Sequence, residues 1–483
     1  MQKWQMRFFA LLTGLFIALF PVFSEQTEIP GLFKYKLENG LEVFVFENHA
    51  VPLARIQITF RCGSISQTPE TAGLFHFYEH MLFKGNTAYP TKTEFKSALT
   101  RLGVATWNGG TSTEYVTYFF TVPSTKVKEG IEFWSHAVIS PLFDEQELEV
   151  EKGVVINEIK GYFNEPDSIF ESALDTRMFS TYPERRDVSG TEAAIRSATR
   201  DTMLSIKNAY YIPNNAAIFI GGDVSPEETY AAVREFFGGW ERGKDPWKDG
   251  LTPHPDLKEN PRLVYADPAM YQGISTVSMR FRGPDVTADP YATFAADVWG
   301  TLIGSPTGRF KNSVFEKVPG LYEKEYISGY YYTQRDGGVI LFDTFLFSEG
   351  NAADTALQFT EAVQEEMRAM AEEKDYFSEE EFEIVKQKLI DQQIYIMESP
   401  ESFIQNLSFF WAVADTDYFF SYIPTMRSMK SDDLSAFLNR YINSRNFITA
   451  VRMNKADYEK QASTFKDRGF EEITKANAYW WAK

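Results

Sequence analysis

The hydrophobic positions change their spacing several times along the first half of the chain, and each change marks a predicted element. Two strand-like runs at 32–38 and 41–46 flank Asn39-Gly40, which predicts a β-hairpin with a type I′ turn. Further strands are predicted by β-branched and aromatic residues at 54–62, 115–122 and 216–220. Helices are predicted by helical spacing and capping residues at 70–83, 91–102 and 144–162.

A second series of elements follows a segment without apolar periodicity. Residues 241–260 are rich in glycine, proline, lysine and aspartate, which predicts a linker. Strands and helices are then predicted at 263–266, 274–281, 291–303, 325–333, 339–347, 353–373 and 378–397. Because their order parallels that of the first half, we expect a structural duplication of 25–240 in 261–483, although sequence identity between the halves is not evident.

The N-terminus has the pattern of a secretory signal. Two basic residues precede an apolar run at 8–20, which is short for a membrane span, and residues 22–24 suit cleavage before Glu25. We therefore expect residues 1–24 to be a signal peptide and the mature protein to be exported, periplasmic or secreted; an uncleaved signal anchor is the alternative. No later segment is apolar and long enough to span a membrane.

Charge and cysteine content narrow the partners and the chemistry. The net charge of -19 makes nucleic acid an unsuitable partner. The single cysteine, Cys62, excludes an internal disulfide and a thiolate metal site, and we expect it to be a buried strand residue. A chain of 483 residues is too long for one ordinary core, which again predicts two or more domains.

The pentad His76-Phe77-Tyr78-Glu79-His80 carries the clearest candidate chemistry. On a helix, His76 and His80 lie on one face one turn apart, so both imidazoles can bind one metal ion. Glu79 lies between them, close enough to act on a metal-bound water. The pattern therefore predicts metal-dependent hydrolysis, and it favours zinc without excluding another divalent ion.

A third ligand is expected from elsewhere, because a hydrolytic zinc site usually has three protein ligands and one open position. The predicted helix at 144–162 contains Glu158 among apolar residues, which indicates a partly buried carboxylate that needs a partner. Glu151 lies two turns earlier on the same face and can hydrogen-bond a ligand imidazole. In this interpretation Glu79 takes a proton from metal-bound water and passes it to the leaving amine.

The sequence around the pentad resembles a known family. Residues 73–85 (GLFHFYEHMLFKG) closely resemble the pitrilysin/insulinase zinc metallopeptidases, which share the His-x-x-Glu-His signature and include the mitochondrial processing peptidases. Glu151 and Glu158 resemble the family's paired glutamates, the second of which is the third zinc ligand. Residues 108–112 resemble its active-site edge strand, and 211–224 resemble the segment that closes its first domain. The resemblance is strong from about residue 30 to 240 and weaker beyond.

The resemblance implies an α+β fold. Two structurally similar domains, each a mostly antiparallel sheet packed against helices, would form one half of a clam-shell that encloses a peptide. Residues 25–240 would be the catalytic zinc-binding domain and 261–483 a non-catalytic one. The peptide would add a strand at the sheet edge formed by Asn108, Gly109, Gly110 and Thr111, which favours unfolded or flexible substrates.

One departure from the family concerns the opposing half-shell, which supplies an arginine and a tyrosine. In the matching second-half segment, Phe315 or Glu316 stands where the arginine is expected, and Tyr322 is a candidate for the tyrosine in an open register. The chain is also about half the length of the single-chain family members. We therefore expect a heterodimer with a zinc-less paralogue that supplies the arginine and tyrosine; a homodimer is the alternative.

Three functions follow from these patterns. The leading one is a zinc-dependent endopeptidase that acts on peptides or unfolded polypeptides inside a closed chamber. A non-catalytic scaffold subunit is the second, but the intact set of His76, Glu79, His80 and Glu158 argues against it. The third is a peptide-binding protein in which the metal is incidental. Substrate and cleavage preference are not encoded in any motif of the chain.

Overall fold

Two β-sheets organise the chain. The computed structural model describes residues 25–26 and 29–482, so the expected signal peptide at 1–24 lies outside the described residues. The first sheet has the order β1-β2-β3-β7-β4-β6-β5, and only its β3–β7 pair is parallel among the described strands. These strands are β1 (Glu25–Gln26), β2 (Leu32–Lys36), β3 (Glu42–Glu47), β4 (Leu53–Phe60), β5 (Trp107–Thr111), β6 (Val116–Pro123) and β7 (Ala216–Gly222).

The second sheet repeats this topology. Its order is β10-β11-β9-β12-β8-β13, and its five strands β8 to β12 match β3 to β7 in order and direction, including one parallel pair, β8–β12. The strands are β8 (Arg262–Asp267), β9 (Ile274–Arg282), β10 (Ser328–Tyr332), β11 (Val339–Phe347), β12 (Phe447–Asn454) and β13 (Glu471–Ile473). The expected duplication and the two similar, mostly antiparallel α+β domains are therefore confirmed.

Each sheet buries one face under helices of its own half. The first core contains side chains of α1 (Leu74–Leu82), α2 (Lys92–Arg101), α3 (Val127–Ile139), α4 (Glu145–Tyr162), α6 (Glu192–Ser197), α7 (Arg200–Tyr210) and α8 (Pro226–Phe237). The second core contains side chains of α9 (Pro290–Ile303), α10 (Arg309–Lys317), α11 (Ala352–Glu372), α12 (Glu379–Ile396), α14 (Thr416–Ser428), α15 (Ser431–Leu438) and α16 (Lys455–Asp467). None of the helices in residues 29–482 has the length and apolar character that a membrane crossing requires.

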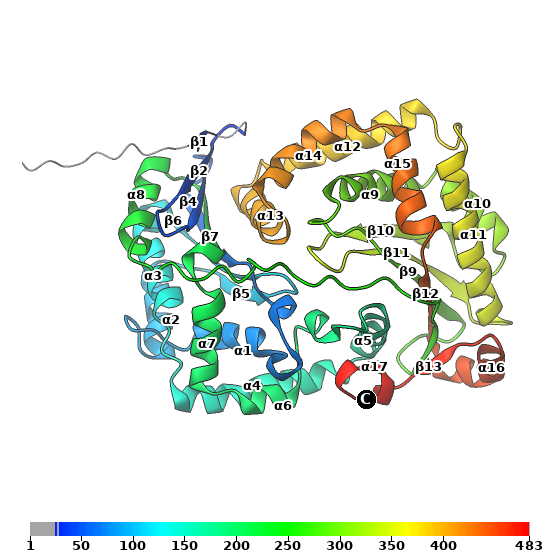
Figure 1. Ribbon diagram of the computed structural model, residues 1–483, viewed down its shortest axis with the longest axis horizontal. Coiled ribbons are helices and arrows are strands. Elements are labelled where there is room, and N and C mark those ends of the chain that lie inside the picture. Colours follow the sequence, from blue (N-terminus) through cyan, green and yellow to red (C-terminus); the bar gives the residue numbers. More distant parts are fainter. Residues whose placement is uncertain (1–24, 27–28, 483) are drawn as a thin grey trace, which may run out of the picture.

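The opposite faces of the two sheets are covered by exchanged helices. Helix α5 (Pro166–Met178), from the first half, packs on the second sheet beside α17 (Lys475–Ala478). Helix α13 (Pro400–Val413), from the second half, packs on the first sheet against β4 and β7, as Figure 1 shows. The division of the chain into 25–240 and 261–483 stays a prediction, and these two helices tie the segments together.

The turn between β2 and β3 differs from the predicted type I′. Gly40 donates its N–H to the carbonyl of Leu37, and Leu37 donates to Leu41. Among the described residues of this hairpin loop, 38–40, only Gly40 has a positive φ, +98°. A type I′ turn needs positive φ at both central residues, so the prediction is wrong, and the loop is a three-residue connection with a left-handed glycine. Asn39 instead donates its side-chain amide to the carbonyls of Phe237 and Trp240.

Candidate metal centre

Helix α1 holds both histidines and begins later than the sequence predicts. Gly73 precedes it with φ +91°, and a Cβ at this position would lie 2.5 Å from the carbonyl oxygen of Ser189. The left-handed glycine therefore sets the start of the helix at Leu74 instead of at residue 70. The apolar residues of α1 are buried in the first core, and His76 and His80 are partly exposed.

The two imidazoles and Glu158 converge on one point. The Nε2 atoms of His76 and His80 are 3.2 Å apart, and the two rings stand nearly perpendicular. The Glu158 carboxylate of α4 reaches them at 3.7 Å from His76 and 3.6 Å from His80. Among the described residues, this is the one group of three or more His, Cys, Asp or Glu side chains arranged to hold a metal ion.

The donor set fits zinc. Bond lengths of about 2.0–2.1 Å and tetrahedral angles place zinc ligand atoms roughly 3.3–3.4 Å apart. The two Nε2 atoms are 3.2 Å apart, and Glu158 approaches His76 Nε2 at 3.7 Å through Oε1 and His80 Nε2 at 3.6 Å through Oε2, separations close to this value. Two imidazole nitrogens and a carboxylate oxygen are also the chemical ligands that zinc accepts in hydrolytic sites.

Glu158 is more exposed than expected from its apolar neighbours. Its side chain is 54% exposed, so the predicted partial burial is wrong. On α4, Val155, Ile156 and Ile159 pack into the first core, and Glu158 lies at the edge of this buried face, where it approaches the histidines of α1. Successive residues of a helix point about 100° apart, so a carboxylate between apolar neighbours in sequence can still lie at the exposed edge of the face that they bury.

Glu151 fixes the orientation of His80. Its Oε1 lies 2.9 Å from His80 Nδ1, and because a carboxylate only accepts, Nδ1 carries the proton and Nε2 is left to bind a metal. Oε2 pairs with Lys84, and the Glu151 side chain is only 6% exposed. Burial acts to raise the pKa of Glu151, but the bonds from His80 and Lys84 outweigh it and lower that pKa. Lys84 was not among the residues predicted for the site; it lies just past the end of α1, two residues after Leu82.

Glu79 is nearly buried beside the candidate metal ligands. It is 9% exposed, and Thr111 donates its hydroxyl to Glu79 Oε2 at 2.9 Å. Burial raises the pKa of Glu79, and the Thr111 bond and the positive charge of His80 oppose part of that rise. A carboxylate with a raised pKa is a stronger base than a solvated one, which suits proton transfer near neutral pH.

Strand β5 brings the expected peptide-binding residues next to α1. It is the last strand of the first sheet and pairs with β6 alone among the described strands. Gly109 allows a close approach, since a Cβ there would lie 2.9 Å from Phe83 Cζ and 3.2 Å from Glu79 Cγ. Asn108 is exposed, and Gly110 and Thr111 are partly exposed. The structure thus brings the predicted ligands, Glu79, Glu151 and this edge strand together.

Comparison with known proteins assigns the family. Residues 43–192 match the model of the insulinase family, peptidase family M16, and residues 197–389 match that of the peptidase M16 inactive domain. The chain belongs to peptidase family M16. It is a peptidase-family protein whose curated relatives include named zinc proteases.

Individual M16 relatives cover the chain to different extents. The uncharacterized zinc protease YmxG of Bacillus subtilis is 31% identical over 212 residues, which are 44% of this chain and 51% of the relative. The M16 chain thus spans about half the length of the curated relatives it matches. A protease from Helicobacter pylori has a TM-score of 0.73 at 18% identity, over 87% of this chain and 99% of its own. The periplasmic protease PqqL from Escherichia coli has a TM-score of 0.70 at 13% identity, over 92% and 50%.

The second half of the M16 chain has an edge hairpin and a helix equivalent to those of the candidate site, but it lacks the two histidines. Gly109 pairs with Tyr118 across β5–β6, and Gly329 pairs with Phe342 across β10–β11. A Cβ at Gly329 would meet Ile303 of α9 much as one at Gly109 meets Phe83. If Ile303 is taken as the equivalent of Phe83, then Ala296 and Gly300 of α9 are the equivalents of His76 and His80. The second half therefore has no imidazoles at these equivalent positions.

The candidate partner-contact residues lie within the second half. Tyr322 packs against Phe347 and Tyr326, with ring centroids 5.4 and 6.0 Å apart. Phe315 is partly buried against the second core, and Glu316 is exposed. A match of Tyr322 to the M16 tyrosine stays a prediction.

Substituting Gly109 by alanine tests the close approach of β5 to α1. We expect Gly109→Ala to lower the free energy of unfolding by about 1–3 kcal/mol, because the new methyl group meets Phe83 and the Tyr118 ring at 2.9 Å. Urea unfolding monitored by circular dichroism measures this. Gly110→Ala is the matched control, since a Cβ there meets nothing within 4 Å. Equal unfolding free energies for the two variants would contradict the packing argument.

Proposed function

We propose that this chain is a zinc-dependent endopeptidase that hydrolyses peptides or unfolded polypeptide segments inside a closed chamber. The observation that carries the proposal is the convergence of the Nε2 atoms of His76 and His80 and the Glu158 carboxylate within 3.2–3.7 Å. Glu79 lies directly before His80 on the same helix. The names of the zinc-protease relatives support the choice of metal.

Zinc held by His76, His80 and Glu158 would act as a Lewis acid that activates water and polarises the scissile carbonyl. Glu79 then takes the proton of the attacking water and delivers it to the leaving amine. The Thr111 hydroxyl holds the Glu79 carboxylate at Oε2, which leaves Oε1 for the proton. Glu151 keeps the proton of His80 on Nδ1 through both steps.

The substrate is proposed to lie along β5 as an added strand. The backbone of Asn108, Gly109, Gly110 and Thr111 would bond the peptide main chain, which gives affinity without a strict sequence requirement. The outer side of β5 pairs with no strand among the described residues, so its backbone groups are available for this role. An extended peptide is required, which selects unfolded segments over folded domains.

A second half-shell is proposed to come from another subunit. Our preferred arrangement is a heterodimer with a zinc-less paralogue that supplies an arginine and a tyrosine, and a homodimer is the alternative. An exported, periplasmic or secreted location is also proposed, on the signal-like sequence at 1–24 and on the fold shared with a periplasmic protease.

The experiment that tests this function compares two preparations. We expect zinc-loaded protein purified from its native source, with any chain that accompanies it, to cleave reduced and carboxymethylated casein, an unfolded substrate. We expect the chain expressed alone to cleave it much more slowly. Full activity of the chain alone, as a monomer by light scattering, would contradict the two-subunit proposal. No cleavage by the native preparation would contradict the peptidase proposal.

A further inference from the structure

The tips of the two edge hairpins meet each other across the two halves. The turn between β5 and β6, residues 112–115, is the equivalent of the turn between β10 and β11, residues 333–338. Glu114 in the first turn accepts the backbone N–H of Arg335 at 2.7 Å through Oε2 and that of Asp336 at 3.1 Å through Oε1. The side chain is 2% exposed, so this is a buried carboxylate used to join two turns.

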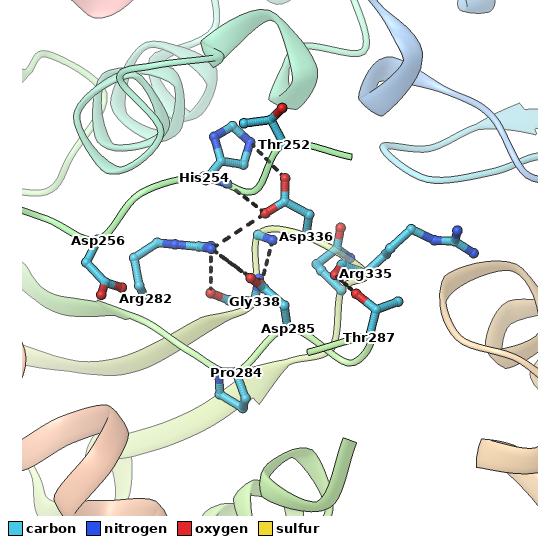
Figure 2. A network of polar contacts seen from close by, with 12 residues as sticks. Thr252, His254, Asp256, Arg282, Pro284, Asp285, Thr287, Arg335, Asp336 and Gly338 are labelled. Carbon is cyan, nitrogen blue, oxygen red and sulfur yellow. Dashed lines mark hydrogen bonds and ion pairs between the residues drawn. The ribbon is translucent and has the colours of Figure 1, made fainter. Parts of the chain in front are cut away.

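The second-half side of this contact is firmly held. Asp336 Oδ1 accepts the backbone N–H of His254 in the 241–260 segment at 3.0 Å, and its carboxylate lies 3.8 Å from the guanidinium of Arg282. The carbonyl of Arg335 accepts the Thr287 hydroxyl at 3.0 Å, and Figure 2 shows both residues within this network. The Arg335 guanidinium also donates to the carbonyl of Ala412, at the end of α13.

On the first-half side, the contact lies close to the candidate metal centre along the chain. Glu114 lies three residues beyond Thr111, whose hydroxyl binds Glu79. The same turn accepts the N–H of Ile65 at the carbonyl of Thr113, 2.8 Å away. Among the described strands, β5 pairs only with β6. The turn therefore holds the Thr111 end of β5, which is the end that contacts Glu79.

We propose that Glu114 is a positioning residue for peptide hydrolysis: its two bonds to the Arg335–Asp336 backbone fix β5 against the second half, and thereby align a bound peptide with Glu79 and the metal ligands. This inference rests on the proposed peptidase function. Glu114 touches neither substrate nor metal in this account. It acts through β5, so its loss weakens peptide binding more than it slows the chemical step.

The protonation of Glu114 gives the contact a pH dependence. Burial raises the pKa of Glu114 from 4.5 to about 7, although the two amide bonds, Arg335 and Arg186 lower it. Tyr115 and Asp336 are the other ionisable groups at this contact. Because the buried carboxyl holds its proton more tightly than a solvated one, the contact contributes fully below pH 4.5 and is weakened as the pH rises through about 7.

Hydrogen–deuterium exchange tests the positioning without substrate. We expect Glu114→Ala to speed amide exchange in the hairpin at 107–123 and in the turn at 333–338, with α16 unchanged. The matched control is Asp457→Asn on α16, a buried carboxylate that accepts the backbone N–H of Gly273 at 2.7 Å. The control should leave exchange at 107–123 as in wild type. Wild-type exchange at 107–123 in Glu114→Ala would overturn the inference.

Casein kinetics test the consequence for binding. We expect Glu114→Ala to raise KM about tenfold and to change kcat less than about threefold, since leaving the backbone N–H groups of Arg335 and Asp336 without their acceptor costs roughly one decade or more in affinity. Glu114→Gln keeps one acceptor oxygen and should show a smaller rise. It also serves as the test if Glu114→Ala does not fold.

The pH profile separates this role from a merely structural one. Between about pH 6 and pH 8, we expect the KM of wild type to rise and that of Glu114→Gln to stay flat, because the amide does not titrate. Asp457→Asn should follow wild type. If wild type cleaves no casein, the proposed function fails and this inference falls with it. If wild type cleaves but Glu114→Ala and Glu114→Gln share its KM and its pH profile, only this inference fails.

Discussion

Glu79→Gln is expected to lower kcat for casein cleavage by about 10²–10⁴-fold, the usual contribution of a general base. The amide has the shape of the carboxylate, and its oxygen can still accept the Thr111 hydroxyl that now binds Oε2 at 2.9 Å. It cannot accept a proton at neutral pH. The variant should therefore fold, hold zinc and bind peptide with an unchanged KM.

The control for this variant is Glu149→Gln. Glu149 lies on α4, and its side chain is 69% exposed. Its ion-pair partner within the described part of the chain is Lys152, at 2.7 Å. It should cleave casein at the wild-type rate. Initial rates and zinc content by mass spectrometry are measured on the same preparations. Wild-type cleavage by Glu79→Gln at equal zinc content would show that another group accepts the proton.

The second large effect is expected for His80→Ala, which should lose zinc and all casein cleavage. The substitution removes one of the three ligand atoms and leaves Glu151 paired only with Lys84, so the buried carboxylate keeps a cationic partner and the fold should persist. We expect zinc affinity to fall by more than the roughly 10–100-fold that loss of a ligand's hydrogen-bond partner costs. Competition with a chromogenic chelator measures the affinity.

Two further variants are expected to show an intermediate loss and no loss of zinc affinity. Glu151→Gln removes the charged partner of His80 Nδ1 and should lower zinc affinity by about 10–100-fold. His136→Ala removes a histidine of α3 whose side chain is 38% exposed and should leave zinc affinity unchanged. Retention of wild-type zinc affinity by His80→Ala would contradict the assignment of His80 as a ligand.

Part of this site could be predicted from the spacing of residues within one helix. His76 and His80 are one helical turn apart in the sequence pattern, and that geometry alone sets their Nε2 atoms side by side. The duplication of strand order is likewise visible in the pattern, because each strand and helix is a local property of its own residues. The prediction of Glu158 rests first on partial burial among its apolar neighbours, which is wrong, and that of Glu151 on its spacing from Glu158. The resemblance to the M16 family supports both residues and adds β5, which no local spacing connects to α1.

Long-range contacts could not be derived in this way. Lys84 meets Glu151 across two helices, and Glu114 meets the turn at 333–338 from more than two hundred positions away. The exchange of α5 and α13 between the halves has no local signal either, since an amphipathic helix does not specify which sheet it covers. The prediction of the turn at 38–40 was wrong for a local reason: Asn39-Gly40 is compatible with two hairpin loops that differ in length by one residue.

The most direct test of the account is a zinc titration of the chelated protein. The protein is purified from its native source with any accompanying chain, stripped of metal, and assayed for casein cleavage after each addition of zinc. The account predicts no cleavage without zinc and a linear recovery that ends at one zinc per copy of this chain. Cleavage by the stripped protein, or no recovery at full zinc occupancy, would contradict it.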